Sequence, residues 1–143
     1  MKTLLLTTLA VALAGHSLAQ SAAQRFDVPF AFHVGNKLLP AGAYSVHGEA
    51  NSGAISVSAI RNGAGGAFIL SYRVDSPTGA NPSTATLVFT RYDDQSYFLS
   101  QAWSGTWPGG LATIKSRAER QYADNKVTAR IKPVTVRVAA SLK

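Results

Sequence analysis

Short runs in which apolar and polar residues alternate are the feature that most constrains how this chain can fold. Residues 26–34 (FDVPFAFHV) carry Phe or Val at every second position, and this period puts those side chains on one face of a β-strand. Pro29, on the opposite face, has no N–H to donate to a neighbouring strand, which predicts an edge position or a bulge. The alternation therefore predicts a half-buried strand rather than a helix.

Further runs of this kind are separated by turn residues. Residues 43–47 follow an LPAG turn and predict a short strand. Residues 54–61 and 68–74 predict one hairpin, and residues 85–92 and 97–103 predict a second. Bulky inward-facing residues should fill the core rather than leave a pocket: Phe26, Phe30, Phe32, Phe68, Leu70, Tyr72, Phe89 and Leu99.

One stretch has a helical pattern. Ser116 and Glu119 have the spacing of a capping box, in which each side chain satisfies a free N–H of the first turn. The helix should end near Asn125, and residues 127–138 predict a last strand with a bulge or break at Pro133. We expect Ile114, Ala118 and Tyr122 to pack inward, and Arg117, Arg120 and Asp124 to face water.

These elements amount to about eight strand segments, with one helix before the last strand. Every connection is short enough for antiparallel pairing, and the 143 residues suit one compact domain. The sequence thus predicts an all-β fold with one short helix, either a small antiparallel β-barrel or a closed β-sandwich.

The N-terminal segment has the pattern of a secretory signal peptide. Lys2 supplies a positive start, residues 4–14 are uncharged and mostly apolar, and residues 17–19 (SLA) provide a small-residue cleavage site. We expect residues 1–19 to be removed and residues 20–143 to form the domain, which would be periplasmic or secreted. No later stretch is long and apolar enough to span a membrane. The chain has no cysteine, which excludes disulfides and thiolate metal sites.

The positive charge is concentrated near the C-terminus. The chain has 14 Lys and Arg residues against 7 Asp and Glu residues, a formal net charge of +7. Basic and acidic residues balance between residues 20 and 114, so the excess of the mature chain lies in residues 115–143. A cluster of this sign favours an anionic envelope polymer or lipid head groups as partner. The candidate surface contacts are Arg117, Arg120, Arg130, Lys132 and Arg137.

Three segments carry a family resemblance. They are FDVPFAFHVGNKLLPAGAYSV from Phe26, LVFTRYDDQSYFLSQAW from Leu87 and KSRAERQYA from Lys115. Together they resemble an uncharacterised family of small, signal-peptide-bearing bacterial proteins. In that family an F-x-V-P-F-x-F-x-V-G strand runs into an L-P-A-G-x-Y turn, and V-F-x-R-Y and K-S-x-A-E segments follow. The resemblance implies export and a compact β-rich domain, and it implies no activity and no site residue.

Residues that could carry chemistry have ordinary structural explanations. Asp27 and His33 share a chain segment but lie about 20 Å apart on an extended strand, too far to bind one ion. Asp93 and Asp94 are adjacent, so on a strand they would point to opposite faces, and they are typical of a turn. The glycines of residues 63–66 join two strands and do not precede a helix, as a phosphate loop would. We assign no catalytic residue, cofactor or metal site.

Trp103 and Trp107 lie in the most distinctive loop (WSGTWPGG). Two indole rings held by Gly and Pro could stack on a sugar or close a barrel mouth. Alternatively, Trp103 ends a strand in the core and Trp107 plugs one end of the domain. The loop is therefore a candidate ligand site with a structural alternative.

Three functions follow, in order of preference. The first is an exported, non-enzymatic β-domain that acts at the cell envelope through its basic C-terminal surface. The second is a carrier of small apolar ligands, with a barrel cavity gated by Trp103 and Trp107. An enzyme of unidentified type is the third. Nucleic acid is not an expected partner, because export and the near absence of aromatic residues among the C-terminal cations argue against it.

Overall fold

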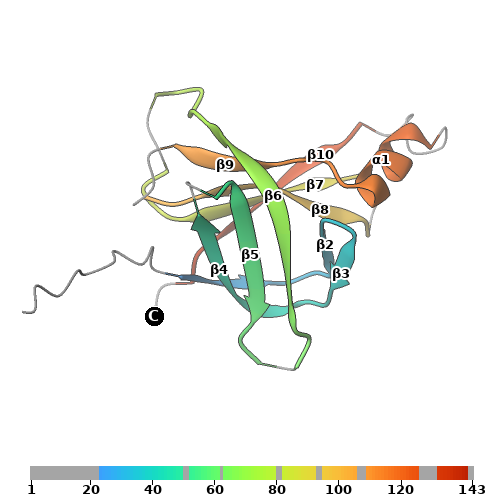
Figure 1. The fold of residues 1–143 in the computed structure, drawn as a ribbon, viewed down its shortest axis with the longest axis horizontal. Helices are drawn as coiled ribbons and strands as arrows, with labels where there is room; N and C mark the ends of the chain where they lie inside the picture. The colour runs from blue at the N-terminus through green and yellow to red at the C-terminus, as the bar shows by residue number, and fades with distance from the viewer. Residues whose placement is uncertain are drawn as a thin grey trace, which may run out of the picture.

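Ten strands and one helix make up the described part of the chain in the computed structural model (Figure 1). The described residues are 23–49, 52–61, 63–79, 82–92, 95–105, 109–125 and 132–141. The strands are β1 (Gln24–Val28), β2 (Phe32–Val34), β3 (Lys37–Leu39), β4 (Gly42–Glu49), β5 (Ala54–Ala59), β6 (Gly66–Val74), β7 (Thr86–Arg91), β8 (Tyr97–Trp103), β9 (Gly110–Thr113) and β10 (Val134–Ala139). The helix α1 (Arg117–Asp124) lies before β10, as predicted. The predicted signal peptide lies outside the described residues.

The strands form a single mixed sheet. Its hydrogen-bonded order is β1-β4-β5-β6-β9-β8-β2-β3, and β7 joins β8 on one side and β10 on the other. In Figure 1, β4, β5 and β6 run steeply across the direction of β7, β8 and β9, so the sheet folds over on itself. The all-β class is confirmed, and both predicted hairpins, β5–β6 and β7–β8, are present as antiparallel pairs.

The sheet is not closed into the predicted barrel, and a single sheet is not the predicted sandwich either. Two contacts distinguish the observed topology from the predicted one. β2 pairs with β8 in parallel, at Phe32–Tyr97 and His33–Phe98, which the short connections of the sequence did not suggest. The segment after β10 meets β1 through a backbone hydrogen bond from Ser141 N–H to the Arg25 carbonyl (2.9 Å). No strand ladder joins β10 to β1 within the described residues.

The N-terminal alternating run is divided into two strands at its proline. β1 ends at Val28, immediately before Pro29, and β2 begins at Phe32. β1 pairs with β4, whereas β2 pairs with β3 and β8, so the break lets one run contribute to two distant parts of the sheet. The single strand predicted over residues 26–34 is therefore wrong. The edge position predicted at Pro29 agrees with the place of β1 at one end of the sheet order.

β6 faces the opposite way from the prediction. Phe68, Leu70 and Tyr72 are 74%, 58% and 56% exposed, while Ile69 is buried. The reason is the pairing of β6 with β5, which places Ile69 opposite the fully buried Ile55. Because directly paired residues point to the same side of a sheet, Ile69 faces the core and its neighbours in the chain face outward. The more apolar side of this strand is therefore the outer one.

Aromatic and branched side chains fill the core between the crossed parts of the sheet. Phe32 is fully buried, and its ring lies edge-on to Tyr44 at 5.1 Å and to Phe89 at 5.3 Å between ring centres. The Tyr44 hydroxyl is satisfied within the fold, because it donates to the Pro40 carbonyl (2.6 Å). Core residues come from nearly every strand: Phe26, Val28, Phe32, Val34, Leu39, Tyr44, Val46, Ile55, Val57, Ile69, Leu87, Phe89, Leu99, Ala102 and Leu111.

Candidate functional site

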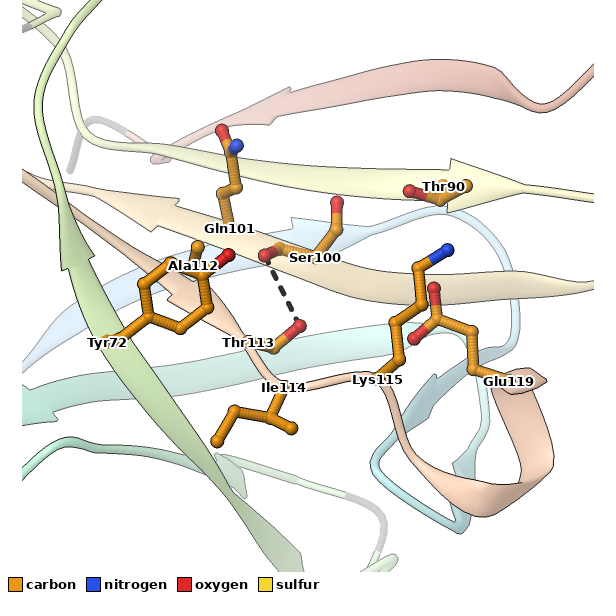
Figure 2. A pocket seen from close by; sticks show the side chains of 9 residues that line it. All are labelled: Tyr72, Thr90, Ser100, Gln101, Ala112, Thr113, Ile114, Lys115 and Glu119. Carbon is orange, nitrogen blue, oxygen red and sulfur yellow. Dashed lines mark hydrogen bonds between the residues drawn. The ribbon is translucent and has the colours of Figure 1, made fainter. Parts of the chain in front are cut away.

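An open trough crosses the outer face of the sheet, opposite the core. It consists of two adjoining hollows of about 1040 and 410 Å³ that share Thr90, Ser100 and Gln101 as their floor. Tyr72 of β6 lines one side, and Arg137 of β10 lines the other. Figure 2 shows the smaller hollow, with Tyr72, Gln101, Ser100 and Lys115 around the open space. We call this surface the trough.

A bulge in β8 shapes the floor of the trough. The β7–β8 register pairs Val88 with Gln101 and Phe89 with Leu99, which leaves Ser100 as the extra residue. Both Ser100 and Gln101 consequently line the trough, although neighbours on a regular strand point to opposite faces. The Ser100 hydroxyl donates to the Val88 carbonyl (2.9 Å), so its proton is already committed.

Trp103 forms part of the trough wall and is itself largely covered. It is 6% exposed, and a Cβ atom added at Gly110 would lie 2.7 Å from its ring, so the indole rests directly on the backbone of β9. Its Nε1–H donates to Gln101 Oε1 (3.0 Å). Since the amide oxygen of Gln101 accepts this bond, its two N–H donors are left to face other partners. Trp103 thus orients Gln101.

This geometry does not support the hypothesis of a carrier for small apolar ligands. It requires a barrel cavity, whereas the sheet is not closed and Trp103 lines an open trough. Trp107 lies outside the described residues. The packing of Trp103 matches the structural alternative, in which this residue ends a strand among buried neighbours.

A buried carboxyl group closes the trough beside α1. Glu119 is 3% exposed, and its Oε1 accepts a hydrogen bond from the Tyr92 hydroxyl (2.9 Å). The Lys115 ammonium lies 5.9 Å from the centre of the Tyr92 ring. Burial raises the pKa of Glu119, against the smaller opposing effects of the Tyr92 hydrogen bond and the Lys115 charge. Burial and the neighbouring Glu119 also raise the pKa of Tyr92.

Contacts at both ends of α1 hold it against the sheet. Ser116 is the N-cap, and its side chain accepts from the Glu119 N–H (3.1 Å), which confirms half of the predicted capping box. The Glu119 carboxylate, expected to complete that box, is bound to Tyr92 instead. Asn36 Oδ1 accepts from the Ala118 N–H (3.0 Å), and Tyr122 packs edge-on to Phe98 at 5.4 Å.

The predicted faces of α1 are partly right. Arg117, Arg120 and Asp124 are exposed, as expected. Ile114 was expected to pack inward, but it is 50% exposed. Its N–H donates to the Leu70 carbonyl (3.0 Å), which continues the β6–β9 ladder and turns the side chain to the outer face beside the β6 residues.

Glu119 gives the stability of the protein a distinct pH dependence. Its folded pKa is raised, so the stability provided by the protonated form is complete below the ordinary value near 4.5 and is lost as the pH rises through the folded pKa. Glu119→Gln keeps an uncharged acceptor for Tyr92. We therefore expect wild type to lose stability relative to Glu119→Gln between pH 4 and neutral pH, measured by urea unfolding. Asp124→Asn, on the exposed side of α1, is the control, and an unchanging difference across this range would contradict the assignment.

The basic residues proposed from the sequence are exposed wherever the structure describes them. Arg117, Arg120, Lys132 and Arg137 all lie on the surface, and Arg130 lies outside the described residues. Arg120 donates to the Lys115 carbonyl (3.1 Å). Within the described ranges, the single ion pair joins Arg25 and Asp27 (3.5 Å), so none of these four cations is neutralised by a carboxylate there.

The basic residues of α1 and β10 lie in neighbouring parts of the fold. β10 begins at Val134, which pairs with Arg91 of β7. Tyr92 follows Arg91 in the chain, and its hydroxyl donates a hydrogen bond to Glu119 of α1. Lys132, two residues before β10, therefore lies near the helix. Arg137 lies farther along β10, opposite Val88, on the edge of the trough.

The two histidines among the described residues differ in their surroundings. His33 stacks on Phe98 at 4.4 Å between ring centres, and burial lowers its pKa. His47 lies on β4 opposite Ser56. The described residues contain no group of three or more His, Asp or Glu side chains that could hold a metal ion. The helix among the described residues, α1, is not long and apolar enough to cross a membrane.

The sequence interpretation missed the trough, although part of its signal is visible. Thr90 and Gln101 occupy the polar positions of the two alternating runs, and Thr135 and Arg137 alternate with core-facing valines in the same way. Polar residues at such positions are typical of a solvent-facing strand face. Only the pairing of β10, β7 and β8 reveals that they line one hollow.

Comparison with protein-family models, with curated proteins and with solved structures finds no match to this chain.

Proposed function

We propose that this protein is an exported, non-enzymatic domain that acts at the cell envelope by binding anionic material through its basic C-terminal surface. This surface comprises Arg117, Arg120, Arg130, Lys132 and Arg137. The observation that supports the proposal is that its four described cations are exposed and are not paired with a carboxylate in the described part of the chain. Such cations keep their full attraction for an external anion.

The distribution of charge strengthens the argument. The body of the chain between residues 20 and 114 is balanced in basic and acidic residues, so it adds no net charge to that of the C-terminal cations. Among the described cations, Arg117, Arg120 and Lys132 belong to neighbouring parts of the fold, because α1 contacts Tyr92 beside the start of β10. A concentrated set of like charges binds polyanions in a salt-dependent manner, because counterions screen it over about 8 Å at physiological ionic strength.

Removing two of these cations should weaken binding strongly. Each basic residue near an anionic surface contributes about 1 kcal/mol at moderate salt, so the double variant Arg117→Gln/Arg120→Gln should bind about thirtyfold more weakly. The measurement is cosedimentation of the mature protein with a deproteinised envelope fraction, repeated with phosphatidylglycerol vesicles and with polyphosphate. Binding of the wild type should fall steeply between low and high salt.

The matched control removes the same charge elsewhere. Arg61→Gln/Arg73→Gln changes two exposed arginines outside the basic C-terminal surface, and it should retain most of the binding. If both double variants weaken binding equally, net charge alone is responsible and the surface assignment fails. Binding of the wild type that is identical at low and high salt would reject the proposal altogether.

A further inference from the structure

We infer that the trough binds an acidic polysaccharide, with sugar units lying along its floor and carboxylate groups facing Arg137. The inference rests on the proposed function, since Arg137 belongs both to the basic C-terminal surface and to the trough. It adds a ligand class and a set of contacts that the charged surface alone does not provide.

The floor of the trough has the chemistry of a hydroxyl-rich ligand. Thr90, Thr135 and Gln101 present hydroxyl and amide groups, which donate and accept hydrogen bonds as sugar hydroxyls do. The Gln101 amide is held by the Trp103 indole, so its orientation is fixed before a ligand arrives.

One exposed aromatic residue of the trough, Tyr72, complements the apolar face of a sugar ring. Tyr72 is 56% exposed and lines the smaller hollow, where Figure 2 shows its ring beside Ala112 and below Gln101. An exposed ring of this kind offers a flat apolar surface together with one polar group. Trp103 lines the larger hollow as part of its wall.

The size of the trough fits a chain rather than a single ion. From β10 to β6 the sheet order crosses β7, β8 and β9, which is about 19 Å at the usual strand spacing. The two hollows are continuous through Thr90, Ser100 and Gln101, and both are open to solvent. A polymer can therefore enter and leave along the surface.

Charges at the edges favour acidic sugars. Arg137 lies on one side and Lys115 at the α1 end, and a guanidinium group can bind a carboxylate through two parallel hydrogen bonds. Two acidic residues also line the trough. Glu119 is engaged by Tyr92 and lies near Lys115, and Asp75 follows β6 at the larger hollow. Within the described residues, no ion pair joins Asp75 to Arg137.

The test compares two exposed aromatic residues of one strand. Tyr72 and Phe68 both face outward from β6, but only Tyr72 lines the trough. Binding of the full mature chain to oligogalacturonate, alginate and hyaluronate fragments is measured by calorimetry. We expect at least one of these acidic glycans to bind, Tyr72→Ala to weaken its affinity about tenfold, and Phe68→Ala to leave it within about twofold.

A second pair of variants tests the role of the carboxylates. Arg137→Gln should weaken binding of the acidic glycan more than Arg73→Gln, which removes the same charge outside the trough. For oligogalacturonate, methyl esterification of the carboxylates should abolish this difference. Equal effects of the two arginine substitutions would overturn the assignment of Arg137.

The outcomes separate this inference from the proposed function. If anionic vesicles or polyphosphate bind in a manner sensitive to Arg117→Gln/Arg120→Gln while none of the glycans binds, the proposed function stands and the inference is overturned. The same conclusion follows if Tyr72→Ala and Phe68→Ala have equal effects on a bound glycan. If no anionic probe binds, both fail.

Discussion

Phe32→Ala should destabilise the protein by about 3–5 kcal/mol, a large part of the total stability of a domain this size. The ring of Phe32 is fully buried and lies edge-on to both Tyr44 and Phe89. Its strand, β2, is also the one that joins β3 to β8. Truncation would leave a cavity where three parts of the sheet meet, with rings on two sides that lose their contacts. Urea denaturation of the mature chain measures the effect.

The control for Phe32→Ala is the same chemical change on the outer face. Phe68 is 74% exposed, so Phe68→Ala removes little buried surface and should change the free energy of unfolding by less than about 1 kcal/mol. Equal destabilisation by the two substitutions would show that β2 is not part of the core.

The second large effect tests which way β6 faces. Ile69→Ala should cost about 2–5 kcal/mol, because Ile69 is buried opposite Ile55, whereas Leu70→Ala should cost less than about 1 kcal/mol. The two residues are adjacent in the chain and have side chains of similar size. Measuring both free energies of unfolding therefore isolates orientation as the variable. A larger loss for Leu70→Ala would restore the orientation expected from the sequence and contradict the observed register.

Local patterns predict the elements of this fold well. The alternation around Phe26 predicts extended structure, although it forms two short strands where a single strand was expected, and the Ser116 N-cap predicts where α1 begins. These features depend on residues a few positions apart. Backbone geometry over such distances is decided largely by the residues themselves.

The orientation of β6 could not be predicted because both of its faces carry apolar residues. Phe68 and Leu70 give one face the stronger hydrophobic pattern, and the other offers Ala67, Ile69 and Ser71. The choice between them is made by β5 and β9, whose pairing places Ile69 beside Ile55 and Ser71 beside Thr113. Register between strands is a property of the whole sheet, and periodicity in one strand does not contain it.

The candidate site is harder to predict than the fold for a similar reason. Glu119 has the spacing of a capping residue, and its local sequence gives no sign of the bond to Tyr92, which lies 27 residues away. The trough is assembled from β6 to β10 and from α1, so its residues are scattered between Tyr72 and Arg137. The bulge that turns both Ser100 and Gln101 toward it appears only when β8 is paired with β7.

The hydrogen bond between Ser141 and Arg25 has a consequence for how the protein is made. The Ser141 N–H bonds to the Arg25 carbonyl, and its hydroxyl bonds to Asp27, so a late segment secures the first strand. β10, in turn, covers the free edge of β7. While a ribosome is still synthesising β10, β7 lacks its outer neighbour and β1 lacks this tie. The native sheet is therefore completed only after residues 134–141 have emerged, and contacts this distant in sequence make folding slow.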